Sequence, residues 1–107
     1  MMIYHITLIP DWESARGGDE YTAASLGTEG FIHCSEREQV ERSLNRFYHD
    51  RPMVLLLGID PDLLTSELKY EGAHGEMFPH IYGPINIGAV RTVETMLREA
   101  GGYRYSG

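Results

Sequence analysis

The most apolar stretch of the sequence is Met53-Val54-Leu55-Leu56-Leu57-Gly58-Ile59. Pro52 precedes it and Asp60-Pro61 follows it, and both mark places where regular structure begins or ends. A strand without polar positions has no face to turn toward water, so we expect Met53–Ile59 to be buried on both faces. The run is far too short to cross a membrane as a helix.

Other segments also read as strands, because they are short, rich in strand-forming residues and bounded by turn residues. The expected strands cover residues 2–8, 30–35, 66–70, 77–82 and 88–96. The last of these also suits a helix, but its β-branched residues favour a strand. Pro79 interrupts the fourth of these, and a proline is tolerated in a sheet mainly at an edge or an irregularity. In the second, alternation predicts Phe31, His33 and Ser35 on one face and Ile32 and Cys34 on the other.

Two helices are expected, and a further turn of helix should start at Asp60-Pro61, because proline suits the first helical position after an acidic cap. Asp11 to Gly17 reads as a short helix with Asp11 as its cap, after Pro10 has ended the first strand. Ser35 and Glu38 match the capping box, in which each side chain binds the other residue's amide, and an amphipathic helix should follow to about His49. Because strands and helices do not alternate regularly, we expect an α+β domain with a curved, mostly antiparallel sheet.

Size and charge narrow the class of protein. The 107 residues suit a single domain spanning 1–107. A formal charge of -7 repels polyanions, so nucleic acid is an unlikely partner. Cys34 is the single cysteine, which excludes an internal disulfide and fits a reducing compartment. With no leader or membrane segment in the sequence, we expect a cytoplasmic protein.

Three histidines on expected strands are the main candidates for chemistry. Each stands two residues before a hydroxyl side chain and therefore on the same face of its strand. These pairs are His5 with Thr7, His33 with Ser35, and His80 with Tyr82. A single histidine usually has a structural role, but three such pairs favour a shared polar cleft. Histidine titrates near neutral pH, so such a cleft can move protons or hold anions.

Cys34, Ser35 and Glu71 lie close to these histidines in the sequence, and each has a structural interpretation. Cys34 should point into the core, where a thiol stays protonated and inert. The hydroxyl of Ser35 suits a helix cap better than a nucleophile. Glu71 is a candidate general base or ribose-binding carboxylate, or an exposed charge at a strand end. His5, His33 and His80 could also ligate zinc, although no two of them have the spacing of a known ligand pair.

Four motifs together are specific: IYHIT at residues 3–7, EGFIHCS at 29–35, YEG at 70–72 and FPHIYGP at 78–84. With them the sequence resembles a family of small bacterial proteins, the domain-of-unknown-function family numbered 952. The resemblance implies a fold similar to that of the ADP-ribosyltransferases, in which split, curved antiparallel sheets hold NAD in a central cleft.

The resemblance also implies roles for individual residues. By position, His5 looks like the first-strand residue that contacts a ribose, Ser35 or Tyr21 like the hydroxyl residue of a middle strand, and Glu71 like the late acidic residue that orients the reacting ribose. We therefore predict His33, Glu71 and His80 as catalytic residues. The predicted substrate-binding residues are His5, Thr7, Tyr21, Ser35 and Tyr82.

Three functions remain open at this level. The first is an enzyme or binder acting on NAD or on another ADP-ribose or phosphate compound, with NAD as substrate and no resident cofactor. The second is a non-catalytic module for a metabolite or a protein, with homodimer formation left open. The third, and least favoured, is a zinc hydrolase built on the three histidines.

Overall fold

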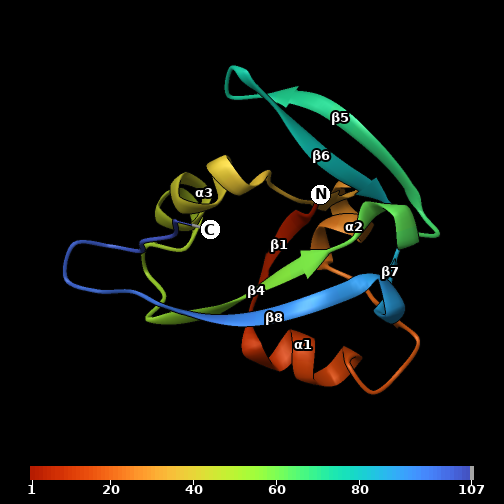
Figure 1. Cartoon of the computed structure of the whole chain (residues 1–107), viewed down its shortest axis with the longest axis horizontal. Helices are drawn as coiled ribbons and strands as arrows, with labels where there is room; N and C mark the ends of the chain where they lie inside the picture. The colour runs from red at the N-terminus through yellow and green to blue at the C-terminus, as the bar shows by residue number, and fades with distance from the viewer. Residues whose placement is uncertain (107) are drawn as a thin grey trace.

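The computed structural model describes residues 1–106 and has an α+β architecture made of small antiparallel sheets and short helices (Figure 1). The α-helices are α1 (Ile9–Ala15), α2 (Ala24–Glu29) and α3 (Val40–Phe47). The strands are β1 (Ile3–Thr7), β2 (Glu20–Tyr21), β3 (Ile32–His33), β4 (Met53–Ile59), β5 (Glu67–Ala73), β6 (Glu76–Tyr82), β7 (Ile85–Asn86) and β8 (Val90–Leu97). Three 3-10 turns lie at Arg37–Gln39, Pro61–Leu63 and Ile87–Ala89.

The expected buried strand is the middle of a three-stranded sheet. β4 lies between β1 and β8 and is antiparallel to both. Its residues 54–59 are all buried, and only Met53 at its start is exposed. The prediction of a strand buried on both faces is therefore confirmed apart from this first residue.

Two hydrophobic clusters cover the two faces of this sheet. Leu55 and Leu57 pack in a cluster with Trp12 of α1 and Tyr21 of β2. Leu56, one residue out of phase, packs in the other cluster with α3 and the C-terminal segment. Because successive side chains of a strand point to opposite faces, one apolar run serves both clusters.

The second sheet carries four of the eight predicted site residues, His33, Glu71, His80 and Tyr82. Its strand order is β3-β6-β5, and His33 of β3 stands directly opposite His80 of β6. β5 and β6 form a long hairpin over residues 67–82, which projects from the body in Figure 1. The short β2-β7 pair completes the sheets of the described part of the chain.

The tip of the β5–β6 hairpin is tied to α3. Arg42 forms a two-pronged ion pair with the carboxylate of Glu76. Gln39 donates to the carbonyl of Met77 at 2.9 Å, and Arg46 lies 2.9 Å from Nδ1 of His74. These contacts hold the hairpin in place from one end.

The prediction for the first helix was wrong at its start. α1 begins at Ile9, so Pro10 lies in its first turn and does not end the preceding strand. Asp11 lies inside the helix and Leu8 occupies the cap position. Proline suits the first turn, because its missing N–H would have no partner there and its fixed φ is already helical.

The predicted capping box was wrong by one residue. Glu36 and Gln39 form the box, and the chain passes through a 3-10 turn before α3 starts at Val40. Ser35 stays extended because its backbone exchanges two hydrogen bonds with Tyr4, of 2.7 and 2.9 Å. Helical spacing from Val40 and Leu44 places Phe47 and Tyr48 on the buried face of this helix. Phe47 is exposed, whereas Tyr48 packs against the core.

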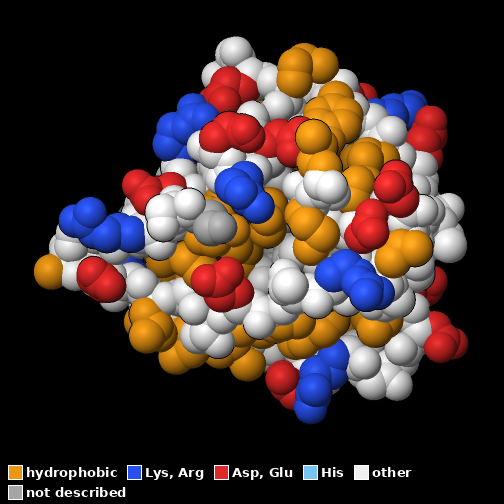
Figure 2. Space-filling model, in the orientation of Figure 1, with side chains coloured by type: hydrophobic (Ala, Val, Ile, Leu, Met, Phe, Trp, Pro, Cys, Tyr) orange, Lys and Arg blue, Asp and Glu red, His pale blue; other side chains and the backbone are white. Residues whose placement is uncertain are grey.

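The surface in Figure 2 mixes acidic and basic side chains over the whole visible face. Within residues 1–106, no helix is long and apolar enough to cross a membrane.

Candidate functional site

A histidine, a carboxylate and a tyrosine meet on the β5–β6 hairpin. Nδ1 of His80 lies 2.8 Å from Oε1 of Glu71, and the hydroxyl of Tyr82 donates to the same oxygen at 2.5 Å. His80 and Tyr82 share a face of β6, as alternation predicts, and Glu71 comes from the neighbouring strand. Two donors on one oxygen lower the pKa of Glu71, the Tyr82 hydroxyl contributing most.

This geometry assigns the proton on His80. An ionised carboxylate only accepts hydrogen bonds, so Nδ1 of His80 carries the hydrogen. In the neutral imidazole, Nε2 then keeps its lone pair free. His80 is only 5% exposed, yet no fully buried side-chain nitrogen or oxygen among the described residues lacks a partner. Nε2, which has no hydrogen bond, therefore reaches the surface.

A second imidazole and a phenyl ring lie beside His80. The ring of Phe31 stacks on that of His80 with centroids 4.0 Å apart, and the ring of His33 is 5.5 Å from His80. Nε2 of His33 lies 3.1 Å from Oε2 of Glu29, and both of these side chains are about half exposed. Each of the two histidines is thus paired with its own carboxylate.

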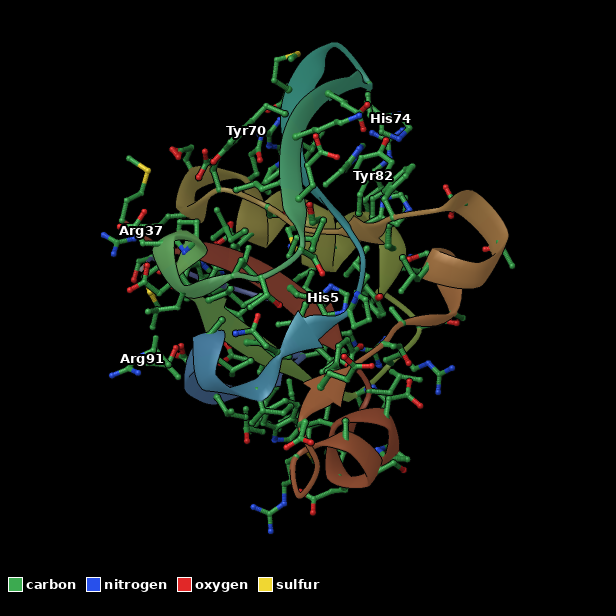
Figure 3. The ribbon with its side chains drawn as sticks, turned by 90° about the vertical axis from the view of Figure 1, so that its right-hand side faces the viewer. His5, Arg37, Tyr70, His74, Tyr82 and Arg91 are labelled. Carbon is green, nitrogen blue, oxygen red and sulfur yellow. The ribbon has the colours of Figure 1, made fainter. Side chains whose placement is uncertain are left out.

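We call this group the histidine face and define it as Phe31, His33, Glu71, His80 and Tyr82. In Figure 3, Tyr82 lies on the opposite side of the hairpin from Tyr70 and Arg91. Lys69 adds a positive charge at its margin, with Nζ 4.8 Å from the centre of the Tyr82 ring. The face therefore combines aromatic surface, two imidazoles and both signs of charge.

His5, Thr7 and Tyr21 form a separate, buried network. Nε2 of His5 lies 2.8 Å from the hydroxyl oxygen of Tyr21, which is also 2.8 Å from Oγ1 of Thr7. All three residues are buried. Nδ1 of His5 lies 2.6 Å from the carbonyl oxygen of His33, so the network supports the backbone of β3 directly beneath the histidine face.

Burial sets the protonation of this network. Desolvation lowers the pKa of His5 to about 4 and raises that of Tyr21 to about 12. The carbonyl of His33 can only accept, so the single hydrogen of neutral His5 is on Nδ1. Nε2 can then only accept, so the one hydroxyl hydrogen of Tyr21 lies within reach of two acceptors, Nε2 of His5 and Oγ1 of Thr7.

Ser35 does not join His33. Its hydroxyl lies 3.1 Å from that of Ser43 on α3 and is buried. The expected common face of His33 and Ser35 was wrong, because β3 ends at His33 and the chain then pairs with β1 at Tyr4.

Sequence reasoning missed Phe31, a member of the histidine face, and Glu29, the hydrogen-bond partner of His33. Phe31 had a signal, since it stands two residues before His33 and was expected on its face. Glu29 had none, because it belongs to the end of α2. Gly30, with φ of 88°, turns the chain between Glu29 and the strand, a conformation that side chains other than glycine rarely adopt.

The alternative of a three-histidine zinc site finds no support in the geometry. Both ring nitrogens of His5 are occupied by Tyr21 and by the carbonyl of His33. Within residues 1–106 no group of three or more His, Cys, Asp or Glu side chains is placed to hold a metal ion.

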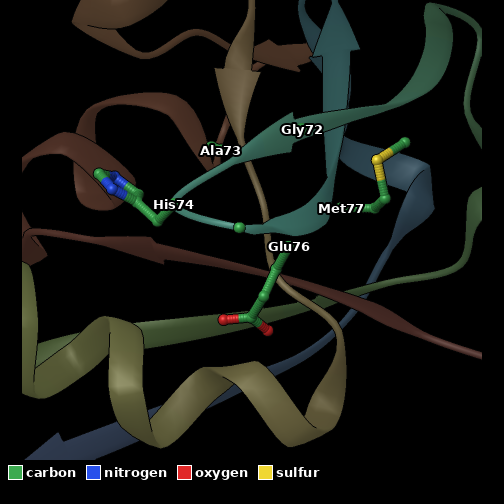
Figure 4. Close-up of a pocket in the computed structure, with 6 residues that line it drawn as sticks. Gly72, Ala73, His74, Glu76 and Met77 are labelled. Carbon is green, nitrogen blue, oxygen red and sulfur yellow. The ribbon is translucent and has the colours of Figure 1, made fainter.

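Two surface depressions lie away from the histidine face. One, of about 440 Å³, is formed by residues 72–77 at the hairpin tip (Figure 4). The other, of about 520 Å³, lies between α3 and the turn after β8 and is lined by Asn45, His49 and residues 98–102. Neither contains a predicted site residue.

A family model for proteins of unknown function, DUF952, matches residues 6–93. The chain belongs to the DUF952 family. The matched region runs from the end of β1 to the middle of β8, and it includes the whole histidine face.

Solved structures resemble this DUF952 protein along its length. The crystal structure of protein CC0527 from Caulobacter crescentus is 26% identical, with a TM-score of 0.88 over 97% of this chain and 94% of that one. A solution NMR structure of CC0527 gives 27% identity and a TM-score of 0.81, over 95% and 90% of the two chains. No curated protein matches the sequence.

Cys34 lies in the core, as predicted, and burial raises the pKa of its thiol. We expect the folded protein to react with a thiol reagent such as dithionitrobenzoate far more slowly than the unfolded protein, because only the thiolate reacts. Rapid labelling of native protein would show that Cys34 is accessible.

Proposed function

We propose that the histidine face binds a nucleotide-like ligand, NAD or another compound containing ADP-ribose or phosphate, and that the protein acts on it as a transferase. The observation that carries this proposal is the Glu71–His80 pair, which leaves Nε2 of His80 open beside an aromatic surface. The resemblance of the motifs to proteins with an ADP-ribosyltransferase-like fold names the ligand class.

In this proposal His80 is the general base. An imidazole whose Nδ1–H is held by a carboxylate presents Nε2 to a substrate in one tautomer and one orientation. Nε2 would take the proton of an attacking hydroxyl or water. Glu71 then acts through His80 as a positioning residue.

The other members of the face would bind the ligand. His33, supported by Glu29, can donate to phosphate or ribose oxygens, and Phe31 offers apolar contact. The hydroxyl of Tyr82 donates its one hydrogen to Glu71, so it can only accept a hydrogen bond from the ligand. Lys69 can contribute a charge to an otherwise acidic molecule.

The buried residues have an indirect part in this proposal. His5, Thr7 and Tyr21 hold the carbonyl of His33, and Ser35 holds the start of the 3-10 turn against α3. We assign them to positioning β3, with the ligand contacting the face above. The proposed setting is the cytoplasm, with a small molecule and no nucleic acid as partner.

The test is a binding measurement with NAD, ADP-ribose and inorganic phosphate as separate probes. A ligand at 100 times its dissociation constant adds about 2.7 kcal/mol of stability. For a domain of this size, each kcal/mol raises Tm by about 4–8 °C. We expect at least one probe to raise Tm, and calorimetric titration to give a stoichiometry of one per chain.

His80→Gln is the decisive variant, since it keeps a polar side chain but removes the basic nitrogen. We expect affinity to fall by at least about tenfold, which is ~1.4 kcal/mol. His49→Gln is the matched control, because His49 is exposed and lies outside the histidine face. If no probe binds the native protein, or if both variants bind alike, the proposal fails.

One observation favours a second function, a binding module without catalysis. The depressions at the hairpin tip and beside α3 do not include the histidine face, and a small ligand normally binds in a concave site. Tight binding of NAD or ADP-ribose without turnover over days, at a neutral pH, would favour this alternative.

A further inference from the structure

β8 forms an open edge of the central sheet. In the order β1-β4-β8, one side of β8 pairs with β4, and no described strand within residues 1–106 pairs with the other. Figure 1 shows β8 alongside β4, on the side away from β1. Residues 91–95 and Leu97 are exposed, and Figure 3 shows Arg91 pointing away from the body.

The backbone groups along this edge can be assigned. The amide of Arg98 donates to the carbonyl of Pro52 at 2.9 Å, so Arg98 points its backbone groups toward β4. In an antiparallel pair the N–H and C=O of one residue point to the same side, and successive residues alternate. Val93, Thr95 and Leu97 therefore direct their N–H and C=O groups outward.

The edge has few of the features that normally prevent strand pairing. Lysine, proline and short length usually protect such edges, whereas β8 has eight residues and neither of those residue types. Its charged residues are Arg91 and Glu94. Val93 is 46% exposed and Leu97 59%, and both are apolar. A bulge in which Arg91 is the extra residue limits the edge at one end. The Glu99–Gly102 turn limits it at the other.

We propose that a second copy of this chain pairs with β8, antiparallel and about a two-fold axis at Thr95, so that the two sheets continue into one. Closed two-fold pairing is the commonest form of homo-oligomer and leaves no further edge at that point. The proposal is independent of the ligand at the histidine face.

Side-chain chemistry favours a two-fold axis at Thr95 over an axis at either of the two preceding residues, Val93 and Glu94. An axis at Glu94 would place that carboxylate against its own copy, and like charges directly opposite are unfavourable. An axis at Val93 would bring Leu97 opposite the partner's Ala89, which is buried in its own fold. An axis at Thr95 brings Val93 opposite the partner's Leu97, so the two exposed apolar side chains cover each other.

Charge supports the same register at its ends. With the axis at Thr95, Arg91 stands opposite the partner's Glu99, and the symmetric contact repeats at the other end. Pairs of opposite charge across strands add a modest stabilisation. Both residues are exposed and form no ion pair in the described part of the chain.

Sedimentation velocity over a concentration series tests the interface. We expect the native protein to dimerise and Val93→Lys to raise the dimer dissociation constant by more than about tenfold. Leu63→Lys is the matched control, since Leu63 is 44% exposed and lies away from β8. A native protein that stays monomeric at its highest attainable concentration, or a Val93→Lys variant that dimerises like the control, would overturn the proposal.

Cross-linking tests the register. Thr95→Cys should form a disulfide-linked dimer under mild oxidation, because the two Thr95 positions face each other across the axis. Val93→Cys should not, because its copy lies four residues further along the partner strand. The native Cys34 is buried and gives little background. Preferential cross-linking of Val93→Cys would contradict the register.

Discussion

Lowering the pH from 6.5 to about 4 is expected to destabilise the protein by ~3 kcal/mol through His5 alone. Burial lowers the pKa of His5 from 6.5 to about 4 in the native state. The unfolded chain therefore takes up a proton in this range while the native state does not. A total stability of about 5–15 kcal/mol is typical for a domain, so this loss is large.

His5 and the carboxylates lose their contributions to stability over different pH ranges. The pKa of His5 is lower in the native state than in the unfolded chain, so its contribution to stability is fully present above pH 6.5. This contribution is lost as the pH falls from 6.5 to about 4, and it does not change further at lower pH. The pKa values of Glu71 and Glu76 are also lowered, by hydrogen bonds from Tyr82 and Arg42 first. Their contributions are fully present above the ordinary carboxyl pKa of 4.5 and are lost as the pH falls below it.

Urea unfolding at a series of pH values would measure this effect. His5→Asn should flatten the slope between pH 6.5 and about 4, because the amide cannot take up a proton. His49→Gln, at an exposed position, should keep it. If His5→Asn does not fold, side-chain NMR of the native protein can follow the His5 ring directly. A His5 pKa at its ordinary value would refute the prediction.

Replacing Tyr21 with phenylalanine is expected to destabilise the protein by about 1–3 kcal/mol, although the ring itself remains. The hydroxyl of Tyr21 links His5 and Thr7, each at 2.8 Å. Without it, Nε2 of His5 is buried without a partner, and the desolvation cost of that nitrogen is no longer offset.

Chemical unfolding of Tyr21→Phe beside Tyr70→Phe checks this prediction. Tyr70 is 43% exposed, and removing its hydroxyl should change stability by no more than about 0.5 kcal/mol. The motif resemblance had suggested Tyr21 as a ligand-binding hydroxyl. A Tyr21→Phe variant with native stability but weaker binding of a ligand would restore that role and contradict a purely structural one.

Residue type and spacing gave correct predictions where contacts between residues close in the sequence determine the structure. The apolar run of β4, the strand at residues 90–97 and the cap at Asp60 before Pro61 all follow from residue type and spacing. The shared face of His80 and Tyr82 also follows, because alternation along a continuous strand needs no tertiary information.

Predictions failed where distant contacts compete with local ones. Ser35 and Glu38 match the sequence pattern of a capping box. The hydrogen bonds between Ser35 and Tyr4 keep the backbone extended at Ser35, so the box forms one residue later, between Glu36 and Gln39. Tyr4 is far from Ser35 in the sequence, so no local pattern reports this pairing.

The sequence by itself determined the α+β class, the buried central strand and the residue types available for chemistry, because these depend on composition and periodicity. Only the tertiary structure decided how the three histidine pairs are divided. His5 lies in a buried network, His33 and His80 lie side by side on the histidine face, and Ser35 turns to α3. The physical reason is strand pairing: it sets which side chains meet, and here it joins segments that are tens of residues apart.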